Sequence, residues 1–170
     1  FLKKYSKIFV LAWTTTPWTL PSNTALTVGE KIEYCLIKTF NLYTHQPINV
    51  VLAKELITKV FKTNFKEVLN QDELIFNNDK EIPYMLMETF LGKQIIGMKY
   101  NQIWDDAPLP NDSPENAFRL IAGDFVTTED GTGIVHTAPT FGADDAIAAR
   151  NAKPEVPPML IKNKNDDLVP

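Results

Sequence analysis

Cysteine is almost absent from this chain: Cys35 is the single cysteine among 170 residues. One cysteine can form neither an internal disulfide nor a cysteine-based zinc site. Its neighbours Tyr34, Leu36 and Ile37 are apolar, which predicts a buried core thiol rather than a reactive one. A reducing, cytoplasmic setting is the expectation that follows.

Long hydrophobic runs are also missing. No apolar stretch reaches the roughly 18 residues that a membrane span needs, and the first residues carry no signal-peptide pattern. Neither membrane insertion nor secretion is therefore indicated. Because Phe1 and Pro170 do not resemble natural termini, we expect an excised piece of a larger protein.

Positive charge is scarce as well, since the net charge is −4 and the only basic cluster near the start is Lys3, Lys4 and Lys7. Strong electrostatic binding of nucleic acid depends on cations that neutralise phosphates. If a nucleic acid is a partner, most of the affinity must come from elsewhere. The sequence also lacks a glycine-rich phosphate loop, a serine triad and metal-ligand spacing, so we expect no metal and no cofactor in this domain.

What the chain does have is an apolar, β-branched run that leads into three threonines. Residues 8–15 read as a strand, in which Thr14 and Thr16 would share one face and Thr15 would take the other. Pro17 donates no backbone hydrogen bond and restricts the residue before it, so the strand should end here. A broken ladder leaves backbone groups and hydroxyls that a ligand can use, although threonine is also ordinary strand content.

The rest of the chain predicts many strands and few helices. We expect strands at 24–28, 32–39, 48–52, 92–100, 118–122, 125–128, 133–137 and 159–161; helices at 53–61 and from Asp144 onward; and a helical or irregular piece at 65–70. Asp130 and Gly131 between two of these strands predict a hairpin turn, and Asp144 suits the N-cap of the last helix. Without strict βαβ alternation, the fold class is α+β, a closed or nearly closed β-barrel with peripheral helices.

Two motifs resemble the editing domain of isoleucyl-tRNA synthetases. The stretch from Trp13 to Asn23 resembles the threonine-rich motif of that domain, and Thr16-Pro17-Trp18 departs from the Arg-Pro pair of the valyl and leucyl enzymes. The stretch from Gly131 to Pro139, followed by residues 142–145, is similar to the other signature of the same domain. Residues 35–115 show much less resemblance.

The resemblance implies that residues 1–170 form a single barrel-like editing domain, an insertion in an isoleucine-tRNA ligase. Its activity would be hydrolysis of mis-activated or mischarged valine, Val-tRNA(Ile), with exclusion of isoleucine. Its partners would be the acceptor end of isoleucine tRNA and the catalytic body of the parent synthetase, with no membrane involved. Two alternatives remain: a module that binds the acceptor end without catalysis, and a structural insertion that only contacts the parent enzyme.

The resemblance also assigns roles to residues. Asp145 matches the aspartate that holds the α-ammonium of the aminoacyl group, a charge-assisted contact; without the resemblance, Asp144 and Asp145 would both read as acids at a helix N-terminus. Thr15 and Thr16, with Thr14 nearby, would supply hydroxyls to the ester, the ribose or the attacking water. We identify no general base among these residues, and the vicinal hydroxyl of the substrate can assist instead.

Other residues would line the site. His136 matches the histidine that shapes the room for the amino-acid side chain, although a lone strand histidine is more often structural. Asn23 matches a further site position, and it is also a normal turn residue. Trp13 and Trp18 can stack on the terminal adenine or pack in the core. Phe141, after Thr140, departs from the Gly-His of many bacterial relatives and would narrow the pocket or stack on adenosine.

Overall fold

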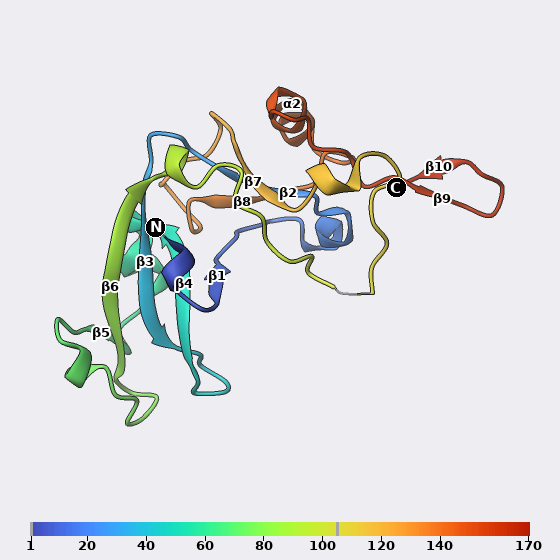
Figure 1. The fold of residues 1–170 in the computed structure, drawn as a ribbon. Helices are drawn as coiled ribbons and strands as arrows, with labels where there is room; N and C mark the ends of the chain where they lie inside the picture. Colours follow the sequence, from blue (N-terminus) through green and yellow to red (C-terminus); the bar gives the residue numbers. More distant parts are fainter. Residues whose placement is uncertain (1, 105) are drawn as a thin grey trace.

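The computed structural model describes residues 2–104 and 106–170. A five-stranded sheet, a three-stranded sheet and a hairpin follow one another across the molecule, and α2 (Ala143–Asn151) covers the middle (Figure 1). The strand order of the first sheet is β1 (Ile8–Val10), β4 (Pro47–Ala53), β3 (Glu33–Phe40), β6 (Ile82–Leu91) and β5 (Phe65–Glu67). The second sheet has the order β7 (Arg119–Ala122), β2 (Ala25–Val28) and β8 (Ile134–Thr137), and the hairpin joins β9 (Ile161–Lys162) to β10 (Leu168–Val169).

The five-stranded sheet is built around β3, which pairs antiparallel with both β4 and β6. Its middle residues are fully buried because both of its edges and both of its faces are covered. Cys35 lies in this strand, its thiol donates to the Leu52 carbonyl at 3.5 Å, and burial raises its pKa to about 12. The prediction of a buried core thiol is confirmed.

The three-stranded sheet separates two parts of the core, since alternate residues of a strand face opposite ways. Leu26 and Val28 of β2 pack toward the five-stranded sheet, in one cluster with Tyr34 and Leu36. Ala25 packs toward the other side; its cluster partners are Ile121, Ala148, Ala149 and Val156. The 3₁₀ helix η2 (Pro17–Ser22) lies on the opposite side of this sheet from α2 (Figure 1).

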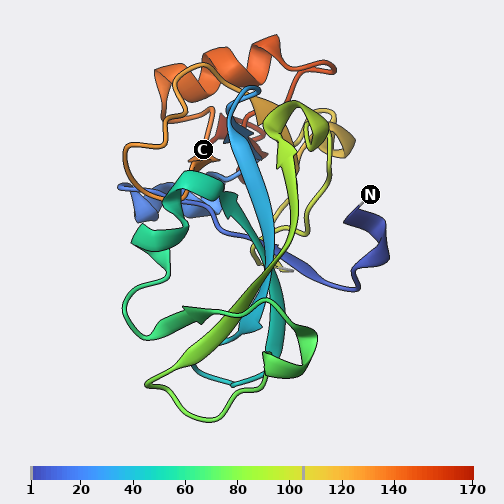
Figure 2. The same cartoon turned by 90° about the vertical axis from the view of Figure 1, so that its left-hand side faces the viewer.

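Figure 2 shows α2 at one end of the molecule and the segment that carries β5 at the other. The α+β class is confirmed, since mixed sheets carry few helices: α1 (Ile57–Val60), α2 and several 3₁₀ turns. Of the expected closed or nearly closed barrel, the closed form is corrected: within residues 2–104 and 106–170 both main sheets are open, and β1 and β5 are the edge strands of the larger one. No helix in this described part is long and apolar enough to cross a membrane.

The strand predicted at 8–15 is shorter than expected. β1 ends at Val10, and the chain then crosses to the second sheet, where the Trp13 N–H bonds to the Ile134 carbonyl at 2.8 Å. The hairpin predicted at Asp130-Gly131 is wrong, because 125–128 is not a strand and β8 pairs with β2 instead. The prediction failed because the partner strand of β8 is β2, which is distant in the sequence, and a local turn signal does not reveal a distant partner.

Four further elements differ from prediction. Residues 92–100 form the 3₁₀ helix η5 (Gly92–Gln94) and a turn at Gly97, whose φ of +83° is incompatible with a regular strand. Residues 65–70 hold the strand β5, parallel to β6, and the predicted helix 53–61 is broken into η3 (Lys54–Leu56) and the single turn α1. The N-cap of α2 is Gly142, not Asp144.

Candidate functional site

The two sequence motifs meet along β8. The Trp13 N–H donates to the Ile134 carbonyl at 2.8 Å, and the His136 N–H donates to the Trp13 carbonyl at 3.0 Å. The first motif therefore lies beside the second motif as an irregular edge of the three-stranded sheet. More than a hundred residues separate them in the sequence.

Two glycines let the second motif turn tightly before β8. Gly131 and Gly133 have φ angles of +72° and +73°, which side chains disfavour. An added Cβ would lie 2.6 Å from Trp13 Cγ at Gly131 and 2.4 Å from Ala53 Cβ at Gly133. The turn is thus held between the first motif and strand β4, and the Ala53 N–H donates to the Thr132 carbonyl at 2.9 Å.

The threonines of the first motif do not continue a strand. The Thr16 N–H donates to Thr14 Oγ1 at 3.0 Å, and the Thr14 and Thr16 hydroxyls are 3.3 Å apart. Thr16 precedes η2, so the Thr19 N–H and the Thr19 hydroxyl both donate to its carbonyl, at 3.0 and 2.8 Å. The result is a short row of hydroxyls, Thr14, Thr16 and Thr19, in which Thr14 is half-buried, Thr16 is exposed and Thr19 is buried.

His136 lies at the inner end of this row and is 5% exposed. Its Nε2 is 3.0 Å from Thr19 Oγ1, and its Nδ1 is 2.9 Å from Asn23 Nδ2. Asn23 Nδ2 also donates to the Ala25 carbonyl at 2.8 Å, which fixes this atom as the amide nitrogen. His136 Nδ1 is therefore an acceptor, and Nε2–H donates to Thr19, whose own proton goes to the Thr16 carbonyl.

The charge state of His136 agrees with these bonds. Burial lowers the pKa of His136 below its ordinary value of 6.5, and the nearby carboxylate of Asp145 opposes this shift. A donor on Nδ1 likewise favours the neutral ring. His136 is neutral and fully hydrogen-bonded, which suits a pocket wall better than a general base.

Asp145 projects from the first turn of α2. Its Oδ2 accepts the Ala138 N–H at 2.8 Å, so the carboxylate ties the helix to the end of β8. Gly142 makes room for it, because an added Cβ there would lie 2.9 Å from Asp145 Oδ2. Asp145 is half-buried, whereas Asp144 is exposed. The structure therefore distinguishes the two acids, and holds Asp145 in one place.

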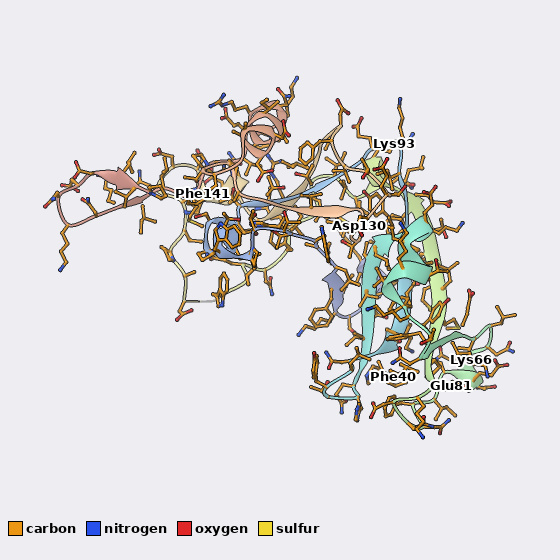
Figure 3. The ribbon with its side chains drawn as sticks, turned by 180° about the vertical axis from the view of Figure 1, so that it is seen from behind. Phe40, Lys66, Glu81, Lys93, Asp130 and Phe141 are labelled. Atoms are coloured by element: carbon orange, nitrogen blue, oxygen red, sulfur yellow. The ribbon has the colours of Figure 1, made fainter. Side chains whose placement is uncertain are left out.

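The remaining predicted residues lie at the surface. Thr15 is exposed, and its hydroxyl has no hydrogen-bond partner within the described residues. Trp13 is 46% exposed, Trp18 75% and Phe141 58%. Phe141 follows β8 at the end away from the five-stranded sheet, and Asp130 precedes β8 at the near end (Figure 3). Within residues 2–104 and 106–170, none of these side chains is hydrogen-bonded to the network of threonines, His136 and Asn23.

Two participants were missed from the sequence. Thr19 lies within the first motif, and its place three residues after Thr16 at the start of a proline-led turn was a usable signal. Tyr100, whose hydroxyl donates to Asn23 Oδ1 at 2.5 Å, is in neither motif. No local pattern marks it.

Together these groups offer hydroxyls, a neutral imidazole and a fixed carboxylate at one end of β8. Such a set can hold an ammonium group, donate hydrogen bonds to a carbonyl and orient a water molecule. Within residues 2–104 and 106–170, no group of three or more His, Cys, Asp or Glu side chains is placed to hold a metal ion.

Comparisons with known proteins agree with this picture. The chain is 50% identical to the isoleucine–tRNA ligase of Cytophaga hutchinsonii over 163 residues, which is 95% of the chain and 14% of that protein. It is 47% identical to the isoleucine–tRNA ligase of Porphyromonas gingivalis over 173 residues, 99% of the chain and 14% of the relative. It is 42% identical to the probable cytoplasmic isoleucine–tRNA ligase of Dictyostelium discoideum over 139 residues, 82% of the chain and 11% of the relative. No protein-family model matches.

The fold has a counterpart among solved structures. The chain is similar to the crystal structure of GlLeuRS-CP1, a connective-peptide (CP1) domain, with a TM-score of 0.52 and 14% identity. The match covers 86% of this chain and 45% of the other. Since the chain spans about one seventh of the length of its relatives, it corresponds to one domain-sized region of them. The chain therefore belongs to the isoleucine–tRNA ligase family, as a domain-sized part with the fold of a CP1 editing domain.

Proposed function

We propose that this chain is the editing site of an isoleucine–tRNA ligase and hydrolyses the ester of valine attached to isoleucine tRNA. The observation that carries the proposal is that the same end of β8 contacts the hydroxyl row through His136 and the fixed carboxylate of Asp145 through Ala138. An aminoacyl ester is already activated, so the site needs to hold the substrate, orient a water molecule and stabilise the developing oxyanion.

In this proposal Asp145 binds the α-ammonium of the valyl group. The Ala138 N–H occupies Oδ2 and fixes the carboxylate, while the half-buried position leaves the group open to a cation. A fixed anion gains more from a charged hydrogen bond than a mobile one, because less side-chain entropy is lost on binding. Asp144 is exposed on the same helix turn and has no such hydrogen bond within the part of the chain that the structure describes.

The threonine hydroxyls donate hydrogen bonds to the reacting ester. The Thr16 and Thr14 hydroxyls are held by each other and by Thr19, which limits the directions in which they donate. Thr15 next to them is exposed and free to turn toward the substrate or the attacking water. Preorganised donors of this kind stabilise charge that develops in the transition state.

His136 and Asn23 form the buried wall behind the threonines. A neutral, hydrogen-bonded imidazole changes position little, so it can set the size of the pocket for an amino-acid side chain. Discrimination by one methylene in a binding pocket is weak, a limit for which isoleucine–tRNA ligases are themselves the usual example, and a second hydrolytic site that excludes the larger amino acid corrects it.

The partners belong to the same proposal. They are the acceptor end of isoleucine tRNA, for which the exposed rings of Trp18 and Phe141 offer stacking surfaces, and the catalytic body of the parent synthetase. A cytoplasmic location, which the name of the Dictyostelium relative carries, is proposed with them. The proposed reaction assigns no metal and no cofactor to this domain.

The test compares release of valine from Val-tRNA(Ile) and of isoleucine from Ile-tRNA(Ile) by the chain, by Asp145→Asn and by Asp144→Asn. The asparagine at 145 still accepts the Ala138 N–H but has no charge for the ammonium. We expect kcat/KM for the valyl ester to fall about 10- to 100-fold, the value of a charged hydrogen bond. Asp144→Asn removes the same charge from the same helix turn and should leave the rate nearly unchanged.

The outcomes separate the alternatives. Release of valine and not isoleucine, lost only in Asp145→Asn, supports editing. Retention of tRNA without release would indicate a binding module. Equal rates for the two asparagine variants would refute the role given to Asp145.

A further inference from the structure

Tyr100 lies outside both motifs but reaches the centre of the site. It follows η5 in the chain, and its hydroxyl donates to Asn23 Oδ1 at 2.5 Å, across 77 residues of sequence. Burial raises the pKa of Tyr100 well above its ordinary value, so the hydroxyl stays protonated in any neutral buffer. Tyr100 is therefore a permanent donor to the Asn23 carbonyl.

The Asn23 side chain has every polar atom engaged. Its Nδ2 donates to the Ala25 carbonyl at 2.8 Å and to His136 Nδ1 at 2.9 Å, while its Oδ1 accepts from Tyr100. Asn23 is 3% exposed, so in the parent protein these protein groups, and not bulk solvent, hold its amide. The amide plane is held at both ends, and its orientation decides which nitrogen of His136 carries the proton.

We propose that Tyr100 is a positioning residue of the site: its hydroxyl holds the Asn23 amide, which keeps His136 as the neutral Nε2–H tautomer and, through it, holds Thr19 and the threonine row. The kinetic consequence rests on the proposed editing function. The effect on the His136 ring does not, because it is a property of the folded chain alone.

The path from Tyr100 to the threonines is continuous. His136 Nε2–H donates to Thr19 Oγ1 at 3.0 Å, and the Thr19 hydroxyl donates to the Thr16 carbonyl at 2.8 Å. Each group has its donor direction set by the one before it. If His136 changed tautomer, Nε2 would become an acceptor, and the Thr19 hydroxyl would have to leave the Thr16 carbonyl to meet it.

Packing alone does not hold the Asn23 amide. A cavity of about 910 Å³ lies between β1 and residues 98–103 and is lined by both Asn23 and Tyr100. Without the Tyr100 hydroxyl, Asn23 Oδ1 is a buried acceptor that has lost its donor, a costly state. Space on the cavity side lets the amide rotate toward water, and His136 Nδ1 then loses its donor.

The test uses Tyr100→Phe, which removes one oxygen, and the matched control Tyr5→Phe. Tyr5 lines the same cavity, but its hydroxyl donates to Glu88 at 3.0 Å, away from His136. The chain has two histidines, so a His45→Gln background leaves His136 as the only imidazole. Its two ring nitrogens are then read directly by ¹⁵N NMR across a pH titration.

We expect the parent protein and Tyr5→Phe to show one neutral tautomer, with Nδ1 bare and Nε2 protonated. Asp145 is the charged group that acts on His136, and it is the same in all variants. In Tyr100→Phe we expect a mixture of tautomers and titration nearer the ordinary histidine pKa, because Nδ1 no longer has a donor. For valyl ester hydrolysis we expect about a five- to tenfold loss of kcat/KM, close to the value of one hydrogen bond.

His136 spectra in Tyr100→Phe that match the parent protein would overturn the proposal, whatever the rates show. Mixed tautomers in the parent protein would also overturn it, and that measurement needs no folded variant. If the parent protein releases no valine, the editing function fails while the nitrogen spectra still decide the role of Tyr100.

Discussion

The neutral state of His136 predicts how the stability of the chain depends on pH. Burial lowers the pKa of this residue below 6.5 in the folded state. In the interval between that lowered pKa and 6.5 the unfolded chain binds more protons than the folded one, so acid favours unfolding. The contribution of His136 to stability is therefore complete above 6.5 and is lost as the pH falls toward the folded-state pKa.

The loss of stability that His136 can cause on acidification has an upper limit. Between about pH 7.5 and 5.5, an unfolded histidine goes from about one-tenth to about nine-tenths protonated, which limits the loss to about 1.4 kcal/mol. This ceiling is reached only if the folded ring stays neutral throughout, as its 5% exposure and two hydrogen bonds favour. A loss of that size is measurable against a typical total of about 5–15 kcal/mol.

The assay is urea denaturation at a series of pH values for the parent protein, His136→Gln and His45→Gln. Carboxylates titrate in all three, so the difference between the parent protein and His136→Gln isolates the one ring. We expect that difference to shrink on acidification, and His45→Gln serves as the control for loss of an imidazole at a more exposed position. Parallel curves for the parent protein and His136→Gln, or a gain in the parent protein's relative stability in acid, would refute the neutral, buried assignment.

Two glycine substitutions test the backbone that supports the site. Gly133→Ala should destabilise the chain by about 2–4 kcal/mol in urea denaturation, because φ is +73° and the new Cβ meets Ala53 at 2.4 Å; a loss below about 0.5 kcal/mol would contradict this. Gly142→Ala should displace the Asp145 carboxylate, 2.9 Å from the new Cβ, and weaken its bond to Ala138. Valine release should then fall while the urea midpoint changes little, and unchanged release would show that Asp145 tolerates the displacement.

Some elements were predictable because their causes are local. The apolar runs at 24–28, 32–39 and 48–52 became β2, β3 and β4, and the alanine-rich run after Asp144 became α2. A strand or helix of this kind is indicated by its own side-chain pattern, which can be read without knowing its partners. The buried position of Cys35 followed from the apolar residues beside it.

Other elements failed because their causes are distant. Asp130-Gly131 carries a good hairpin signal, yet β8 pairs with β2, where Thr27 and Thr137 share a buried 2.6 Å hydrogen bond across 110 residues. No strand was predicted at 82–91, yet these residues form the ten-residue strand β6, which lies between β3 and β5 in the sheet. In both cases the pairing of strands that are distant in the sequence decided the structure.

The sequence by itself determined which residues are candidates for the site: the threonines, Asn23, His136 and Asp145 lie in two recognisable motifs. Only the tertiary structure decided how they act together, since it brings Thr19 and Asn23 to the two nitrogens of His136 and adds Tyr100 from outside both motifs. The physical reason is that the tautomer of a buried ring depends on donors and acceptors within about 3 Å in space, and adjacency in the chain does not specify those neighbours.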